Sequence, residues 1–214
     1  MYHLRLSRQS DLSSIAYCQK LCFPDSLTVI AGSKYTIKSL EWFLNSSHKF
    51  LYHVKNNNGL IAGYIGGFSP QYYGEGSTSG MLQFAMWQGF LGVIAHPWIL
   101  FQKEIIGLYP LVSKNIMRKF LKSGKQVSSP GDKKKFEKRL GVVAIGVHPE
   151  HRGKGVFEML MNIFETEAKQ RGISKLILSV KKDNARAINA YKKMRWEISA
   201  EKDITYEMIK TLTL

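Results

Sequence analysis

The sequence predicts an α/β fold in which a central, twisted, mixed sheet of about six to seven strands is flanked by helices. Two observations carry this prediction. From about residue 50 onward, apolar runs typical of strands alternate with amphipathic helical patterns. Within that part, residues 141–157, GVVAIGVHPEHRGKGVF, read as a strand, a basic glycine-rich loop and the start of a helix. The 214 residues suffice for one core, so we expect a single domain over 1–214 with an insertion at about 70–139.

The N-terminal part predicts one strand and two helices. Leu4 and Leu6 alternate with polar residues, as in a short strand. Asp11 is expected to cap a first helix, which ends at the FPDS turn of residues 23–26. Residues 37–44 then have a second helical pattern.

The compartment is predicted from the cysteines and the first residues. Cys18 and Cys22 are four residues apart in the first helix, so they share a face and close no useful loop. We expect reduced core residues rather than a disulfide or a metal pair. The stretch MYHLRLSRQS has no apolar leader core, and a cytoplasmic chain is therefore the expectation.

The remaining regular elements are predicted from local patterns. Two apolar runs, 50–54 and 60–68, flank an Asn- and Gly-containing turn and predict a β-hairpin. An apolar stripe over residues 156–164 predicts a helix that ends near Gly172. A fully buried strand, a helix capped by Asp183 or Asn184, and two final strands are expected at residues 176–180, 187–194, 196–199 and 204–209.

Within the predicted insertion, residues 81–102 form a run without Asp, Glu, Lys or Arg. It is long enough to cross a membrane, but Gln, Gly, His and Pro interrupt it, and no second such run accompanies it. We expect a buried or surface-lying helical hairpin, with membrane contact and a true span as the alternatives.

Basic residues follow this run and dominate the charge of the chain. Residues 114–139 hold ten Lys and Arg against two acids, within a formal net charge of +15. This stretch is either a solvated face with a mobile loop or a basic surface that meets a phosphorylated substrate or anionic lipid. Together, the two stretches predict a helical, basic insertion between the third and fourth strands. Charge alone does not choose among nucleic acid, lipid and phosphorylated ligands.

The loop at residues 152–157 suits a phosphate or pyrophosphate. Gly153 and Gly155 let the backbone approach a ligand, and Arg152 and Lys154 supply positive charge. The helix that begins there offers unpaired backbone N–H groups. The spacing is not that of a P-loop, and the third glycine of a dinucleotide fingerprint is missing.

Two motifs resemble those of the GNAT superfamily of acetyl-CoA-dependent N-acetyltransferases. RGKGVF at 152–157 is similar to Arg/Gln-x-x-Gly-x-Gly/Ala, and NARAINAYKKMRW at 184–196 is similar to Asn-x-x-Ala-x-x-x-Tyr with a closing Gly-Phe. Phe157 replaces a small residue of the first motif, and Arg195 and Trp196 replace the Gly-Phe of the second. The FPDS turn and the long insertion also look like a branch of the family often associated with amino-sugar or surface-polysaccharide genes.

The resemblance implies acetyl-CoA as cosubstrate. Its pantetheine would pair with the strand at 143–147, and the backbone N–H of Val147 would polarise the thioester carbonyl. Tyr191 would be the catalytic acid for the leaving thiolate. The residues implied in cofactor binding are Ile145, Val147, Arg152, Gly153, Lys154, Gly155, Val156, Phe157, Asn184 and Tyr191.

The base that deprotonates the amine stays open at this point. Glu75, His96, His148 and a water relay are the alternatives. No His, Cys, Asp and Glu residues have the spacing of metal ligands, so no metal is expected. Neither a Gly-x-Ser-x-Gly elbow nor a Cys/His nucleophile pattern is present, which favours direct transfer without a covalent enzyme intermediate.

Three functions remain as hypotheses. The first is N-acetylation of a small-molecule amine, anionic or sugar-linked, such as a nucleotide-linked amino sugar whose phosphates meet the basic insertion. The second is acetylation of a protein N-terminus or lysine, and the third is a non-catalytic CoA-binding or membrane-surface module. No nucleic-acid partner is expected, and peripheral membrane contact through residues 81–139 is an additional hypothesis. The sequence sets neither the acceptor, the length of the acyl group nor the oligomeric state.

Overall fold

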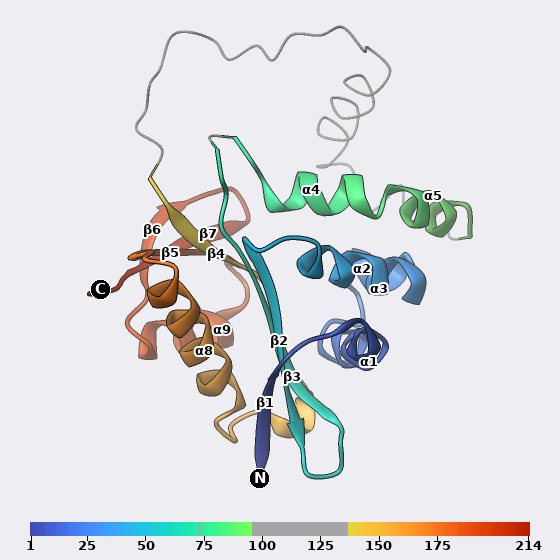
Figure 1. Ribbon diagram of the computed structural model, residues 1–214, viewed down its shortest axis with the longest axis horizontal. Coiled ribbons are helices and arrows are strands. Elements are labelled where there is room, and N and C mark those ends of the chain that lie inside the picture. The colour runs from blue at the N-terminus through green and yellow to red at the C-terminus, as the bar shows by residue number, and fades with distance from the viewer. Residues whose placement is uncertain (73, 96–136) are drawn as a thin grey trace, which may run out of the picture.

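The computed structural model describes residues 1–72, 74–95 and 137–214, and a seven-stranded sheet runs through these residues (Figure 1). The strand order is β1-β2-β3-β4-β5-β7-β6. Of the six neighbouring pairs, only β4 and β5 are parallel, so the predicted mixed sheet is confirmed. The strands are β1 Tyr2–Leu6, β2 Lys49–Asn56, β3 Ile61–Phe68, β4 Arg139–Val147, β5 Lys175–Lys181, β6 Glu197–Glu201 and β7 Thr205–Thr211.

Helices lie on both sides of the sheet. In Figure 1, α1 to α5 lie to the right of the sheet, and α8 lies to its left. The helices are α1 Leu12–Cys22, α2 Leu27–Ile30, α3 Ser33–Glu41, α4 Ser77–Phe84, α5 Met86–Ala95, α8 Val156–Gln170 and α9 Ala185–Lys193. Short 3-10 turns are η1 Gln9–Asp11, η2 Trp42–Leu44 and η4 Pro149–His151. The short helix α2 was not predicted, because four residues are too few to show a helical period.

The N-terminus of α1 differs from its prediction in one detail. Asp11 occupies the cap position, but its side chain accepts no hydrogen bond from the helix. The carboxylate instead accepts from the backbone N–H of Arg8 at 3.0 Å and from Lys55 Nζ at 2.8 Å. Asp11 therefore links the first turn to β2 rather than capping α1.

Two glycines of β3 admit large aromatic side chains. A Cβ at Gly66 would lie 2.5 Å from the ring of Phe43, and a Cβ at Gly67 would lie 2.2 Å from the ring of Phe50. Phe43 belongs to the core cluster formed with α1 and η2, whereas Phe50 belongs to the cluster formed with α8. The GYIGGF sequence thus lets both helical layers approach the centre of the sheet.

The predicted full burial of the 176–180 strand is wrong. Leu176, Leu178 and Val180 are buried, but Ile177 is only half-buried and Ser179 is exposed. Burial alternates along β5, although its residues are mostly apolar. The core that contains α8 covers only one face of the strand completely.

The structure describes only the first part of the predicted insertion. Residues 77–84 and 86–95 form α4 and α5, whereas the basic residues 114–136 and His96 fall outside the described residues. In the described ranges, no helix is both long and apolar enough to span a bilayer. Cys18 and Cys22 are buried free thiols with their Sγ atoms 3.9 Å apart, as predicted for reduced core residues.

We predict that Gly66→Ala lowers the free energy of unfolding by roughly 1–3 kcal/mol, because the buried ring of Phe43 leaves no room for a methyl group. Gly141→Ala is the matched control in the same sheet, since its Cβ meets nothing closer than 3.6 Å. Urea unfolding of both variants measures the difference. Equal losses of stability in the two variants would contradict the packing argument.

Candidate functional site

β4 is paired along nearly its whole length on one side and only at its start on the other. Its pairing with β3 continues to Val147, whereas its pairing with β5 ends at Val142. Residues 143–147 therefore have no neighbouring strand on the β5 side within the described part of the chain. We call residues 143–147 the open edge of β4.

The backbone groups that this open edge offers belong to Ile145 and Val147. The N–H of His148 donates to the carbonyl of Ala62 on β3 at 2.9 Å. Successive residues of a strand direct their N–H and C=O groups to opposite sides, so residues 145 and 147 direct theirs away from β3. Arg152 Nε donates to the carbonyl oxygen of Val147 at 3.2 Å. The backbone N–H of Val147 remains as a donor at the open edge.

The loop that follows has the backbone conformation that its glycines permit. Gly153 and Gly155 have φ values of 71° and 78°, in the left-handed region that favours glycine. A Cβ at either position would meet no atom within 4 Å, so the space beside the loop is open. Gly155 is the N-cap of α8 and supplies no side chain to the first turn, whose N–H groups stay available for an anion.

The charged residues of this loop have different roles. Lys154 is exposed, in the position expected for a residue that meets an anion. Arg152 is half-buried and hydrogen-bonded to the end of β4, which the sequence did not predict. We call residues 152–157 the glycine loop, and Arg152 fastens it to the open edge.

Phe157 and Tyr191 contact each other. Their ring centroids are 5.4 Å apart in an edge arrangement, and Tyr191 also lies 6.0 Å from the ring of Trp196. The bulk of Phe157, which is larger than the family motif expects, is thus packed against α9. Tyr191 is 5% exposed, and burial raises the pKa of its phenol to about 12. The phenol is therefore protonated at physiological pH.

Asn184 begins α9 as predicted. Its side-chain oxygen accepts a hydrogen bond from the backbone N–H of Ala187 at 3.1 Å. The amide nitrogen of Asn184 is left for other partners, while the position of the whole side chain is set by the cap.

Two of the three side chains considered as general base are engaged in local hydrogen bonds. His148 is buried, and its Nδ1 accepts from the N–H of Glu150 at 3.3 Å. Glu75 accepts from the N–H of Gln71 at 2.6 Å and lies 3.8 Å from His48 Nε2. The structure therefore gives both residues a structural partner.

The two thiols lie behind the open edge, which the sequence did not reveal. A Cβ at Gly146 would lie 3.2 Å from Cys22 Sγ. The hydrogen bond with Cys18 lowers the pKa of Cys22 against the effect of burial, and the charges of Arg152 and Arg186 lower it further. The spacing of the cysteines showed a shared helix face, but their arginine neighbours come from the glycine loop and α9.

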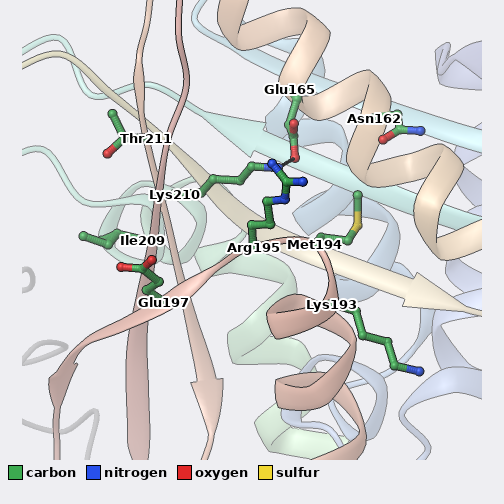
Figure 2. Close-up of a pocket in the computed structure, with 9 residues that line it drawn as sticks. All are labelled: Asn162, Glu165, Lys193, Met194, Arg195, Glu197, Ile209, Lys210 and Thr211. Atoms are coloured by element: carbon green, nitrogen blue, oxygen red, sulfur yellow. Dashed lines mark hydrogen bonds and ion pairs between the residues drawn. The ribbon is translucent and has the colours of Figure 1, made fainter.

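A hollow formed by described residues lies elsewhere on the protein (Figure 2). It measures about 590 Å³ and lies among α8, the α9–β6 turn and β7, and no predicted site residue lines it. Lys210 forms a 2.5 Å ion pair with Glu165 there, and the Arg195 side chain points toward the same pair in Figure 2. Positive and negative charges alternate in this hollow, which makes it a poor match for a polyphosphate.

The open edge and the glycine loop follow one another along the chain and are joined by the hydrogen bond from Arg152 to Val147. The edge can pair with amide groups, and the loop can hold a pyrophosphate a few residues further along. Among the described residues, no three His, Cys, Asp or Glu side chains are grouped so that they could hold a metal ion.

Comparison with known proteins gives one family. The model of the acetyltransferase (GNAT) family matches residues 17–195. The chain is 37% identical over 54 residues to acetyltransferase SG1711 of Sodalis glossinidius, and these residues cover 25% of this chain and 38% of that protein. It is 42% identical over 59 residues to the streptothricin acetyltransferase of Streptomyces lavendulae, covering 28% and 31% of the two chains. The chain thus spans well under half the length of these curated relatives.

The solved structures extend the likeness over the complete fold. The PaiA N-acetyltransferase of Thermoplasma acidophilum, in complex with coenzyme A, superposes with a TM-score of 0.56 at 9% identity. The superposition covers 99% of each chain. At this identity the likeness shows a shared fold.

Proposed function

The chain belongs to the acetyltransferase (GNAT) family, and on that premise we propose that it transfers an acetyl group from acetyl-CoA to a primary amine of a small molecule by direct attack. The observation that carries the proposal is the position of the open edge of β4 directly before the glycine loop. These two features match the two binding groups of a pantetheine diphosphate. One curated relative is named for its action on a small molecule, streptothricin, which favours a small acceptor.

The described residues fit acetyl-CoA, which when bound supplies the acetyl group as an activated thioester. The backbone of Ile145 would pair with the pantetheine, the N–H of Val147 would meet the thioester carbonyl, and the N–H groups of the glycine loop would bind the pyrophosphate. The open space beside Gly153 and Gly155 is what such close backbone contact requires. The residues proposed to hold the cofactor are Ile145, Val147, Arg152, Gly153, Lys154, Gly155, Val156, Phe157, Asn184 and Tyr191.

Two groups of the chain are proposed to act on the reacting atoms. The N–H of Val147 stabilises the negative charge that develops on the thioester carbonyl oxygen. Arg152 binds the backbone carbonyl of Val147, and the N–H of Val147 is left as the donor at the open edge. Tyr191 donates its phenolic proton to the departing sulfur, and its raised pKa keeps the phenol protonated before the transfer.

A water relay is proposed to remove the proton of the amine. Glu75 and His148 each accept a backbone hydrogen bond, which gives both side chains a structural role. His96 lies outside the described residues.

The proposed acceptor is an anionic amine, such as an amino sugar linked to a nucleotide. The support is the net charge of +15 and the ten Lys and Arg against two acids at residues 114–139. Most of those residues lie outside the described part, so the support comes from composition and charge.

We predict that Gly155→Ala weakens the response to acetyl-CoA, because alanine in the left-handed region strains the glycine loop by about 1–2 kcal/mol. Gly172→Ala is the matched control, since Gly172 has a φ of 63° and equally open surroundings at the opposite end of α8. Thermal unfolding is measured with and without acetyl-CoA. A hundredfold excess over Kd should stabilise the wild type and the control by about 2.7 kcal/mol, and Gly155→Ala by less. Equal stabilisation of both variants would remove the loop from the binding site.

We predict that Tyr191→Phe lowers kcat by roughly 10² or more while keeping the ring contacts with Phe157 and Trp196. Because the pKa of Tyr191 is raised to about 12, its deprotonation should not reduce kcat until the pH approaches that value. Tyr17→Phe, on the exposed face of α1, serves as the control. Steady-state rates across pH provide the test, and an unchanged profile in Tyr191→Phe excludes the acid role.

An assay of acetyl-CoA-dependent thiol release is expected to give the highest kcat/KM with nucleotide-linked amino sugars. The panel should pair each phosphorylated amine with its uncharged counterpart, and it should include peptides with free N-termini and lysines. The preference for the phosphorylated member should weaken with added salt, because the attraction is electrostatic. A higher kcat/KM with peptides would assign the acceptor to proteins, and thermal stabilisation by acetyl-CoA without release from any amine would leave a non-catalytic binding module.

A further inference from the structure

α5 directs large apolar side chains away from the protein. Trp87, Phe90 and Leu91 are 66%, 55% and 46% exposed, and their spacing places them on one helix face. The rings of Trp87 and Phe90 stack on each other with centroids 5.9 Å apart. Together with the exposed Met86, these residues form what we call the outer face of α5.

Small residues occupy the inner face of the same helix and fix its orientation. Ala85, just before α5, is completely buried, and a Cβ at Gly89 would lie 3.1 Å from the ring of Tyr35. A Cβ at Gly92 would lie 2.4 Å from the carbonyl oxygen of Ala31. The helix can approach α2 and α3 this closely only with its glycines turned inward. The helix therefore cannot rotate about its axis to bury Trp87. An ordinary surface helix turns its large apolar residues toward the core, whereas α5 turns them outward.

The surroundings of the outer face lack the charges that keep a surface helix in water. Residues 77–95, which contain α4 and α5, include no Asp, Glu, Lys or Arg. A contiguous exposed apolar patch on a soluble domain marks an interaction surface. The nearby helix α3 carries the exposed Lys34, and the chain as a whole has a net charge of +15.

We propose that the outer face of α5 docks on a lipid bilayer that carries anionic headgroups, with the helix lying in the plane of the interface. Trp and Phe favour the headgroup boundary, and a basic protein is attracted to anionic lipid. The inner face of α5 packs against α2 and α3, so the helix meets the bilayer with its outer face alone rather than crossing it. Repulsion between two chains of charge +15 disfavours a second copy as the occupant. This proposal is independent of the acetyl transfer.

The test is cosedimentation of the full chain with vesicles of phosphatidylcholine alone and of phosphatidylcholine with phosphatidylglycerol. The variant W87Q/F90Q/L91Q removes the outer face, and L6Q/I198Q/I204Q removes three other exposed apolar side chains as the matched control. We expect the wild type and the control to bind the anionic vesicles, less strongly at high salt. The outer-face variant should bind them roughly tenfold or more weakly. Thermal stabilisation by acetyl-CoA, measured in parallel, separates this result from a failure of the proposed transfer activity.

Several results would overturn the proposal. If the wild type does not bind anionic vesicles, it has no lipid site. If W87Q/F90Q/L91Q binds them as strongly as the wild type does, binding depends on charge alone. Self-association of the wild type that the variant abolishes, seen by sedimentation velocity without a change in vesicle binding, would make the face a contact between copies. A large loss of thermal stability in the variant, again with unchanged vesicle binding, would show that residues of the same chain cover the face.

Discussion

Beyond Val142, β4 has lost its parallel neighbour while its other edge stays paired with β3. Backbone N–H and C=O groups inside a protein need hydrogen-bond partners. At an unpaired edge in the middle of a sheet, these partners come from side chains or from a ligand rather than from another strand. The side chain of Arg152 provides one such partner to the carbonyl of Val147. The N–H of the same residue is what the proposed chemistry uses.

The glycines of β3 hold this incomplete edge in place. Gly63 lacks a side chain, which lets Val156 and Leu160 of α8 pack directly on the sheet beside Val147. Gly66 and Gly67 admit one phenyl ring on each face of the sheet. Because the start of α8 packs on β3, which pairs with β4 up to Val147, the same strand positions both the N–H of Val147 and the glycine loop. Such positioning is the condition for stabilising charge without rearrangement.

Local patterns were enough to predict the strand, loop and helix over residues 141–157, the hairpin of β2 and β3, and the cap at Asn184. These features depend on glycine conformations, turn residues and apolar periodicity, which neighbouring residues encode. Contacts between distant segments were not accessible in this way. The end of β4–β5 pairing, the bond from Arg152 to Val147, and the arginines near Cys22 all depend on tertiary packing.

The apolar runs were misleading for a related reason. Hydrophobicity predicted a fully buried β5 and a helical hairpin near residue 90, but it did not indicate which face of either element the protein covers. For α5 the deciding residues were Gly89 and Gly92, whose missing side chains determine the inward face. In such a helix, the absence of a side chain carries more information about orientation than the large residues do.

The insertion also has a topological consequence. β3 and β4 are antiparallel neighbours, and Phe68 and Gly141 are opposite each other in the ladder. Residues 69–138 therefore connect two strands that are neighbours in the sheet. The entropy of closing such a loop rises only slowly with length, by about 0.6 kcal/mol for each doubling. A change in the length of this segment therefore adds little loop-closure cost to the pairing of β3 with β4.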